Sequence, residues 1–88
     1  AQYIDWSWEN NPDCKSTAGV RDICPPAAFK GQPDRLYFGN GDGTFRDASD
    51  RLDTKAFGKG LGVLAGDFDQ DSWVDIYVAN DTTNNLYY

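Results

Sequence analysis

Apolar and polar residues alternate in several short stretches of this chain, and no long stretch repeats its apolar residues with a helical period. Residues 61–65 are mostly apolar. In residues 74–79, Val74, Ile76 and Val78 fall on one side and the intervening residues on the other. Alternation of this kind is typical of β-strands. We therefore predict an all-β fold in which these two stretches pair as a hairpin.

A second hairpin is predicted over residues 35–39 and 44–47. The residues between them read Asn-Gly-Asp-Gly, which contains both of the dipeptides that tight hairpin turns prefer. Asp42 lies in this turn, where a structural role is expected rather than a second ion site. Residues 48–54 are expected to form one helical turn.

Carboxylates recur at regular spacing in the link between the first two predicted strands. Asp67, Asp69, Asp71 and Asp75 occupy the first, third, fifth and ninth positions of one short loop. Like charges held this close repel one another, and a hard divalent cation removes that repulsion. Calcium accepts six to eight oxygen ligands in irregular geometry, so these carboxylates and the carbonyl of Trp73 are predicted to bind Ca²⁺. Magnesium fits less well because it retains several waters.

The helix–loop–helix calcium motif is the nearest alternative for this loop. That motif requires Gly at its sixth position and Glu at its twelfth, where this chain has Ser72 and Val78. The predicted flanking strands argue against it as well. An acidic turn without an ion is the remaining alternative.

The overall composition excludes several classes of protein. The net charge of −6 argues against nucleic acid as a partner, because phosphate binding needs a basic surface. No apolar run is long enough to predict a membrane span. The chain has no histidine, and no Ser or Cys has an evident base partner, so an enzyme is not expected. A glycosidase pair made of Asp69 and Asp75 is disfavoured because both belong to one crowded turn.

Residues 1–34 are predicted to form an irregular insert that begins with a short strand over residues 2–6. Nine residues separate Cys14 from Cys24, a spacing that permits a small disulfide loop. Two free thiols or a metal pair are the alternatives, although zinc would lack further soft ligands. A disulfide would indicate an oxidising compartment.

Two further features of the sequence have both a structural and a functional interpretation. Trp6 and Trp8 are expected to cover other parts of the fold, with a carbohydrate-stacking platform as the alternative. Asn80 begins an Asn-Asp-Thr glycosylation sequon, for which a polar turn is the preferred interpretation.

Residues 35–88 are predicted to be propeller-like hairpin repeats. A Leu-Tyr-aromatic sequence occurs at residues 36–38 and again at residues 86–88. A recurrence of about this length, built from two hairpins, fits one propeller blade. Because a single blade cannot cover its own faces, neighbouring units must do so.

Residues 66–81 resemble the FG-GAP/VCBS repeat. More narrowly, the chain is similar to the propellers of ASPIC/UnbV and cartilage-acidic-protein-like secreted proteins. Three other segments agree with this narrower resemblance, namely the Cys14 to Cys24 loop followed by Pro25, residues 34–37, and residues 40–45. The resemblance implies a calcium-bearing β-propeller of several blades, extracellular or periplasmic, whose loop ligands are Asp67, Asp69, Asp71, Asp75 and the Trp73 carbonyl. Ser72 stands where the family usually has Gly.

These observations predict a structural calcium-binding module of an extracellular recognition or assembly propeller. With 88 residues, the chain holds little more than one blade, so a fragment or an assembling subunit is expected. Its expected partners are the remaining blades or further copies of itself, with an extracellular protein or glycan as an additional partner. The alternative functions are a filament subunit that polymerises through exposed strand edges, and part of a carbohydrate-active or adhesion protein.

Overall fold

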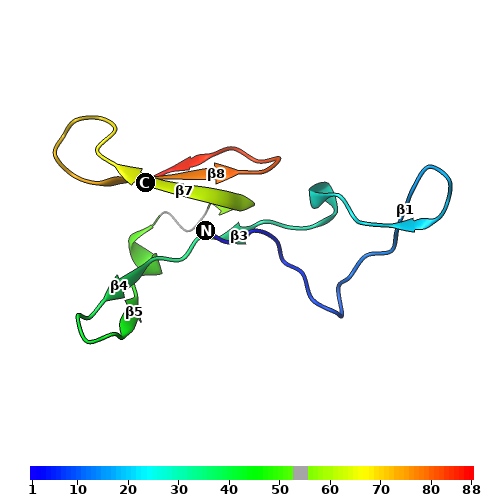
Figure 1. The fold of residues 1–88 in the computed structure, drawn as a ribbon, viewed down its shortest axis with the longest axis horizontal. Coiled ribbons are helices and arrows are strands. Elements are labelled where there is room, and N and C mark those ends of the chain that lie inside the picture. The colour runs from blue at the N-terminus through cyan, green and yellow to red at the C-terminus, as the bar shows by residue number, and fades with distance from the viewer. Residues whose placement is uncertain (53–55) are drawn as a thin grey trace.

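The computed structural model describes residues 1–52 and 56–88, and over these ranges the chain is all-β, as predicted (Figure 1). The described residues contain no α-helix and form no closed propeller. The strands are β1 (Cys14–Lys15), β2 (Arg21–Asp22), β3 (Gln32–Pro33), β4 (Tyr37–Gly39), β5 (Phe45–Asp47), β6 (Phe57–Gly58), β7 (Gly60–Gly66), β8 (Asp75–Asn80) and β9 (Leu86–Tyr87). Two short 3₁₀ helices are η1 (Pro26–Ala28) and η2 (Ser49–Arg51).

The largest sheet has the strand order β7–β8–β9, and both of its pairs are antiparallel. The β7–β8 ladder begins where Gly66 pairs with Asp75 and ends where Gly60 pairs with Asn80. One register shift lies between Gly60 and Gly62. This ladder confirms the predicted hairpin and places the acidic residues in the turn that joins its two strands.

The second predicted hairpin is also present, as the antiparallel pair β4–β5. In its turn, Gly41 and Gly43 both have positive φ, which glycine adopts without steric cost. The Asp42 carboxylate accepts a hydrogen bond from the Thr44 backbone N–H at 2.9 Å. Asp42 therefore stabilises the turn, as expected. Of the helical turn predicted over residues 48–54, η2 is observed, and residues 53 and 54 lie outside the described residues.

The strand predicted over residues 2–6 is not formed. Only an isolated bridge between Ile4 and Gly31 is present there. In contrast, β3 pairs with β6 in a small antiparallel sheet that the sequence did not predict. Both features join segments that are far apart along the chain, and local periodicity carries no information about such pairings.

The insert reaches away from the sheets, and the β1–β2 pair lies near its far end (Figure 1). The molecule is consequently elongated, with extents of 54 × 31 × 21 Å. Its hydrophobic core is very small: among the described apolar residues only Ala48 and Val78 are buried, at 3% and 2% exposure.

Polar contacts attach the insert to the main sheet. The Lys59 ammonium group is buried and donates to the Pro26 carbonyl at 2.6 Å and to the Thr82 hydroxyl at 3.5 Å. The Tyr3 hydroxyl donates to the Asp81 carboxylate at 2.8 Å. These bonds link Tyr3 and, through Lys59, Pro26 of the insert to the region just after β8.

Close backbone approach in the β3–β6 region can be tested with glycine substitutions. A Cβ atom at Gly31 would collide with the Gly58 carbonyl, whereas one at Gly62 would have no neighbour within 4 Å. We expect Gly31→Ala to lower the opening free energy of this small sheet by about 1–3 kcal/mol. Gly62→Ala should change stability by less than about 0.5 kcal/mol. Hydrogen exchange over residues 31–33 and 57–58 measures the effect, and equal protection in both variants would contradict the close approach.

Candidate metal centre

The acidic turn occupies residues 67–74, between the end of β7 and the start of β8. The carboxylate oxygens of Asp67, Asp69 and Asp71 lie within 4.8 Å of one another, and all three residues are exposed. The structure thus brings together three of the four predicted carboxylate ligands. Strands lie on both sides of the turn, which agrees with the sequence-based choice against the helix–loop–helix motif.

Hydrogen bonds from the backbone to these carboxylates shape the turn. Asp67 accepts bonds from the N–H groups of Asp71 and Ser72, each at 3.0 Å. Asp69 accepts a bond from the Asp71 N–H at 3.1 Å, and Asp71 accepts one from the Trp73 N–H at 2.9 Å. Aspartate side chains commonly stabilise tight turns in this way. The hydrogen bonds that these aspartates accept therefore stabilise the turn and also bring their negative charges close together.

Two residues of the turn have backbone conformations that are unfavourable for side chains with a Cβ atom. Gln70 has φ 64° and Ser72 has φ 74°. The positive φ of Ser72 occurs at the position where the sequence resemblance expected glycine. Its strain is of the order of 1 kcal/mol.

Asp75 lies outside the group of three carboxylates whose oxygens are within 4.8 Å of one another, and it has different partners. One of its carboxylate oxygens accepts a hydrogen bond from the Phe68 N–H at 3.0 Å. The Tyr87 hydroxyl of β9 donates to the same carboxylate and, with help from loop N–H groups, holds the pKa of Asp75 below its ordinary value. The same hydrogen bond, burial and the nearby carboxylates raise the pKa of Tyr87 to about 12.

Tyr87 is the residue at this site that sequence reasoning missed. The recurring Leu-Tyr-aromatic sequence was a signal for a strand over residues 86–88, and β9 forms there. The register that brings Tyr87 next to the acidic turn could not be deduced from that signal. Trp73 contributes its N–H to Asp71, and its indole side chain is exposed.

The donor set fits a hard divalent cation. Its side-chain donors are carboxylate oxygens, which calcium prefers, and no sulfur or imidazole ligand is present among them. The ion would be held by Asp67, Asp69 and Asp71, while Asp75 is joined to the same turn through the Phe68 N–H. When bound, such an ion supplies positive charge that offsets the repulsion among the carboxylates.

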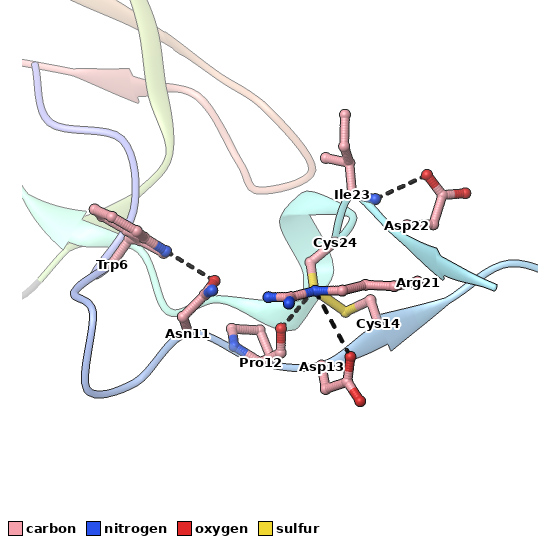
Figure 2. Close-up of polar contacts among 9 residues, drawn as sticks. All are labelled: Trp6, Asn11, Pro12, Asp13, Cys14, Arg21, Asp22, Ile23 and Cys24. Atoms are coloured by element: carbon pink, nitrogen blue, oxygen red, sulfur yellow. Dashed lines mark hydrogen bonds and ion pairs between the residues drawn. A yellow bond between two sulfur atoms is a disulfide. The ribbon is translucent and has the colours of Figure 1, made fainter.

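The insert contains the predicted disulfide, between Cys14 and Cys24 (Figure 2). It ties β1 to the segment just after β2, and the Arg21 side chain lies 3.9 Å from the Asp13 carboxylate on the same hairpin. An open groove of about 750 Å³ lies next to the disulfide. Its walls are mostly apolar and include Tyr3, Trp6, Pro12, Ile23 and Phe29.

The two tryptophans of the insert contact each other rather than a core. Their rings meet edge to face with centroids 5.0 Å apart. The Trp6 indole N–H donates to Asn11 at 3.0 Å (Figure 2). Trp8 is 82% exposed. Trp8 therefore does not have the covering role expected from the sequence, whereas Trp6 is 44% exposed and lines the groove next to the disulfide.

Asn80 is engaged within the fold. Its side-chain amide donates to the Asn84 carbonyl at 2.7 Å, and its oxygen is buried. The side chain also faces Gly58 closely enough that a Cβ atom at Gly58 would collide with it. This arrangement agrees with the polar-turn interpretation of the sequon.

An exposed hairpin with an aspartate-rich turn, in an all-β chain with almost no core of its own, defines a β-repeat module. The comparison with protein families leads to the same class, since residues 27–78 match the FG-GAP-like repeat. This match covers more than half of the chain and includes the whole acidic turn, so the chain belongs to the FG-GAP-like repeat family. No curated protein and no solved structure matches the chain.

The strain at Ser72 leads to a stability prediction. Ser72→Gly should stabilise the turn by up to about 1 kcal/mol, because glycine adopts positive φ freely. Hydrogen exchange over residues 67–75, measured with a calcium chelator present, reports this change. Ser72→Ala is the control, since it removes the hydroxyl but keeps the Cβ atom. A stabilisation of the same size in both variants would show that backbone strain is not the cause.

The disulfide leads to a local prediction. Replacing Cys14 and Cys24 by serine should lower the opening free energy of the loop between them by about 2–3 kcal/mol, on the chain-entropy account. Hydrogen exchange over residues 12–24 should therefore accelerate, while exchange in β7 and β8 stays unchanged. Equal acceleration in both regions would mean that the disulfide supports the whole chain.

Proposed function

We propose that this chain is a structural calcium-binding module of an extracellular recognition or assembly β-propeller. The observation that carries the proposal is the gathering of the Asp67, Asp69 and Asp71 carboxylates within 4.8 Å in a turn between paired strands. Membership of the FG-GAP-like repeat family supports it. The role is structural because the ion would neutralise the turn and fix how β7 meets β8.

The cysteine chemistry supports the proposed location, which is extracellular or periplasmic. Disulfides persist in oxidising compartments, and Cys14 and Cys24 are paired. Millimolar extracellular calcium suits an exposed site of modest affinity. Among the described residues, no helix is long and apolar enough to cross a membrane.

Within the repeat family, we propose that the nearest group is the ASPIC/UnbV and cartilage-acidic-protein-like secreted propellers. The support comes from segments outside the acidic turn. These are the loop closed by Cys14 and Cys24 and followed by Pro25, and the Asn-Gly-Asp-Gly turn before β5.

We propose a binding role rather than an enzymatic one. The chain has no histidine, and both cysteines form the disulfide, which removes the commonest general base and the only thiols. The acids of the turn already accept hydrogen bonds from their own backbone. Such crowded carboxylates suit an ion better than a substrate.

Strand edges favour a second candidate function, that of a filament subunit. Among the described strands, β7 pairs only with β8, and outside that pairing the Gly60 N–H at its start donates to the Gln2 carbonyl. The rest of its outer edge can receive a strand from another copy. The mass of the native protein in solution distinguishes the two functions. A monodisperse monomer would exclude polymerisation.

Calcium dependence is the main test of the proposal. In the full-length protein, adding calcium should slow hydrogen exchange over residues 67–75, and a chelator should reverse the effect. Asp69→Asn should remove most of this response, because it deletes one carboxylate charge from the turn. Asp42→Asn, in the turn between β4 and β5, is the matched control and should keep the response. Calcium-independent exchange in the wild-type protein would refute the calcium role.

A further inference from the structure

Strand pairing places the Tyr87 side chain beside Asp75. In the β8–β9 ladder Tyr87 is directly opposite Tyr77, and Asp75 precedes Tyr77 by two residues. Residues two apart on a strand share a face, so Tyr87 and Asp75 are diagonal neighbours on one face of the sheet. Long aromatic side chains reach across such diagonals, and the Tyr87 hydroxyl donates to the Asp75 carboxylate.

The position of Tyr87 is fixed by the sheet next to it. Ile76 and Tyr88 exchange two backbone hydrogen bonds, each of 2.9 Å, immediately after Asp75 and Tyr87 in their strands. These bonds continue the β8–β9 pairing to the edge of the acidic turn. Tyr87, whose hydroxyl contacts Asp75, is therefore positioned by a paired strand rather than by a free loop.

Asp75 is held from two directions. The Phe68 N–H, inside the turn, donates to it at 3.0 Å, and the Tyr87 hydroxyl approaches from the neighbouring strand. A carboxylate with both partners in place has little freedom to rotate away from the other acids. Without the hydroxyl, only the contact from the turn would restrain it.

We propose that Tyr87 is a positioning residue for the calcium site, because it holds the Asp75 carboxylate against the acidic turn. Through this contact, calcium binding in the turn also stabilises β9. This inference rests on the proposed calcium-binding function. Groups that hydrogen-bond to metal-binding carboxylates orient them, and their loss typically weakens metal affinity by about 10–100-fold. Because Tyr87 is about half exposed, the lower end, about tenfold, is expected.

The sheet provides a matched control for this hydroxyl. Tyr77 lies directly opposite Tyr87, and its hydroxyl oxygen accepts a hydrogen bond from the Asn85 side chain at 2.5 Å. Tyr77→Phe therefore removes a hydroxyl from β8 and its hydrogen bond with the residue just before β9, without removing a partner of Asp75.

The test is a calcium titration of the full-length protein, followed by hydrogen exchange over residues 67–75. The calcium concentration that gives half of the protection should rise about tenfold in Tyr87→Phe and less than twofold in Tyr77→Phe. Melting temperatures measured in chelator should fall by similar amounts in the two variants, since each loses one hydrogen bond. Calcium should also slow exchange over residues 86–88 in the wild type and do so less in Tyr87→Phe.

Each alternative result overturns the inference in a recognisable way. Unchanged or tighter calcium binding in Tyr87→Phe would show that the hydroxyl is only a sheet contact. Equal weakening in the two variants would show that sheet stability, not the position of Asp75, controls binding. A wild-type protein that does not respond to calcium would refute the proposed function itself, and the inference with it.

Discussion

The confinement of like charges between two paired strands is the constraint on which this structure depends. The pairing of Gly66 with Asp75 closes the hairpin, and the residues between them must turn within that span. Aspartate side chains satisfy the backbone N–H groups of the turn, but in doing so they bring three carboxylates within 4.8 Å. The hydrogen bonding that folds the turn therefore also creates its need for positive charge.

The sequence predicted those parts of the fold whose signal is local. The turn before β5 follows from an Asn-Gly-Asp-Gly sequence, and the β7–β8 hairpin follows from apolar stretches on both sides of the acids. The gathering of Asp67, Asp69 and Asp71 follows from their alternate spacing in a tight turn. Each of these features involves residues that are close in the chain.

Features that depend on distant pairing could not be predicted. Residues 2–6 have the composition of a strand, but the fold offers them only the bridge from Ile4 to Gly31. The pairing of β3 with β6 relies on glycines that allow two backbones to approach closely, and the sequence near either strand gives no signal of this pairing. The contact of Tyr87 with Asp75 depends on the register of β9, which a two-residue strand does not encode by itself.

The small core has a consequence for how this chain loses its structure. Val63 and Leu64 are consecutive in β7 and so point to opposite faces, yet they are 49% and 64% exposed. In a repeat array such faces are covered by the units on either side, and most of the unfolding free energy then resides in the contacts between units. Melting should therefore spread from unit to unit as a collective event, and a defect in one hairpin would lower the stability of the neighbouring units.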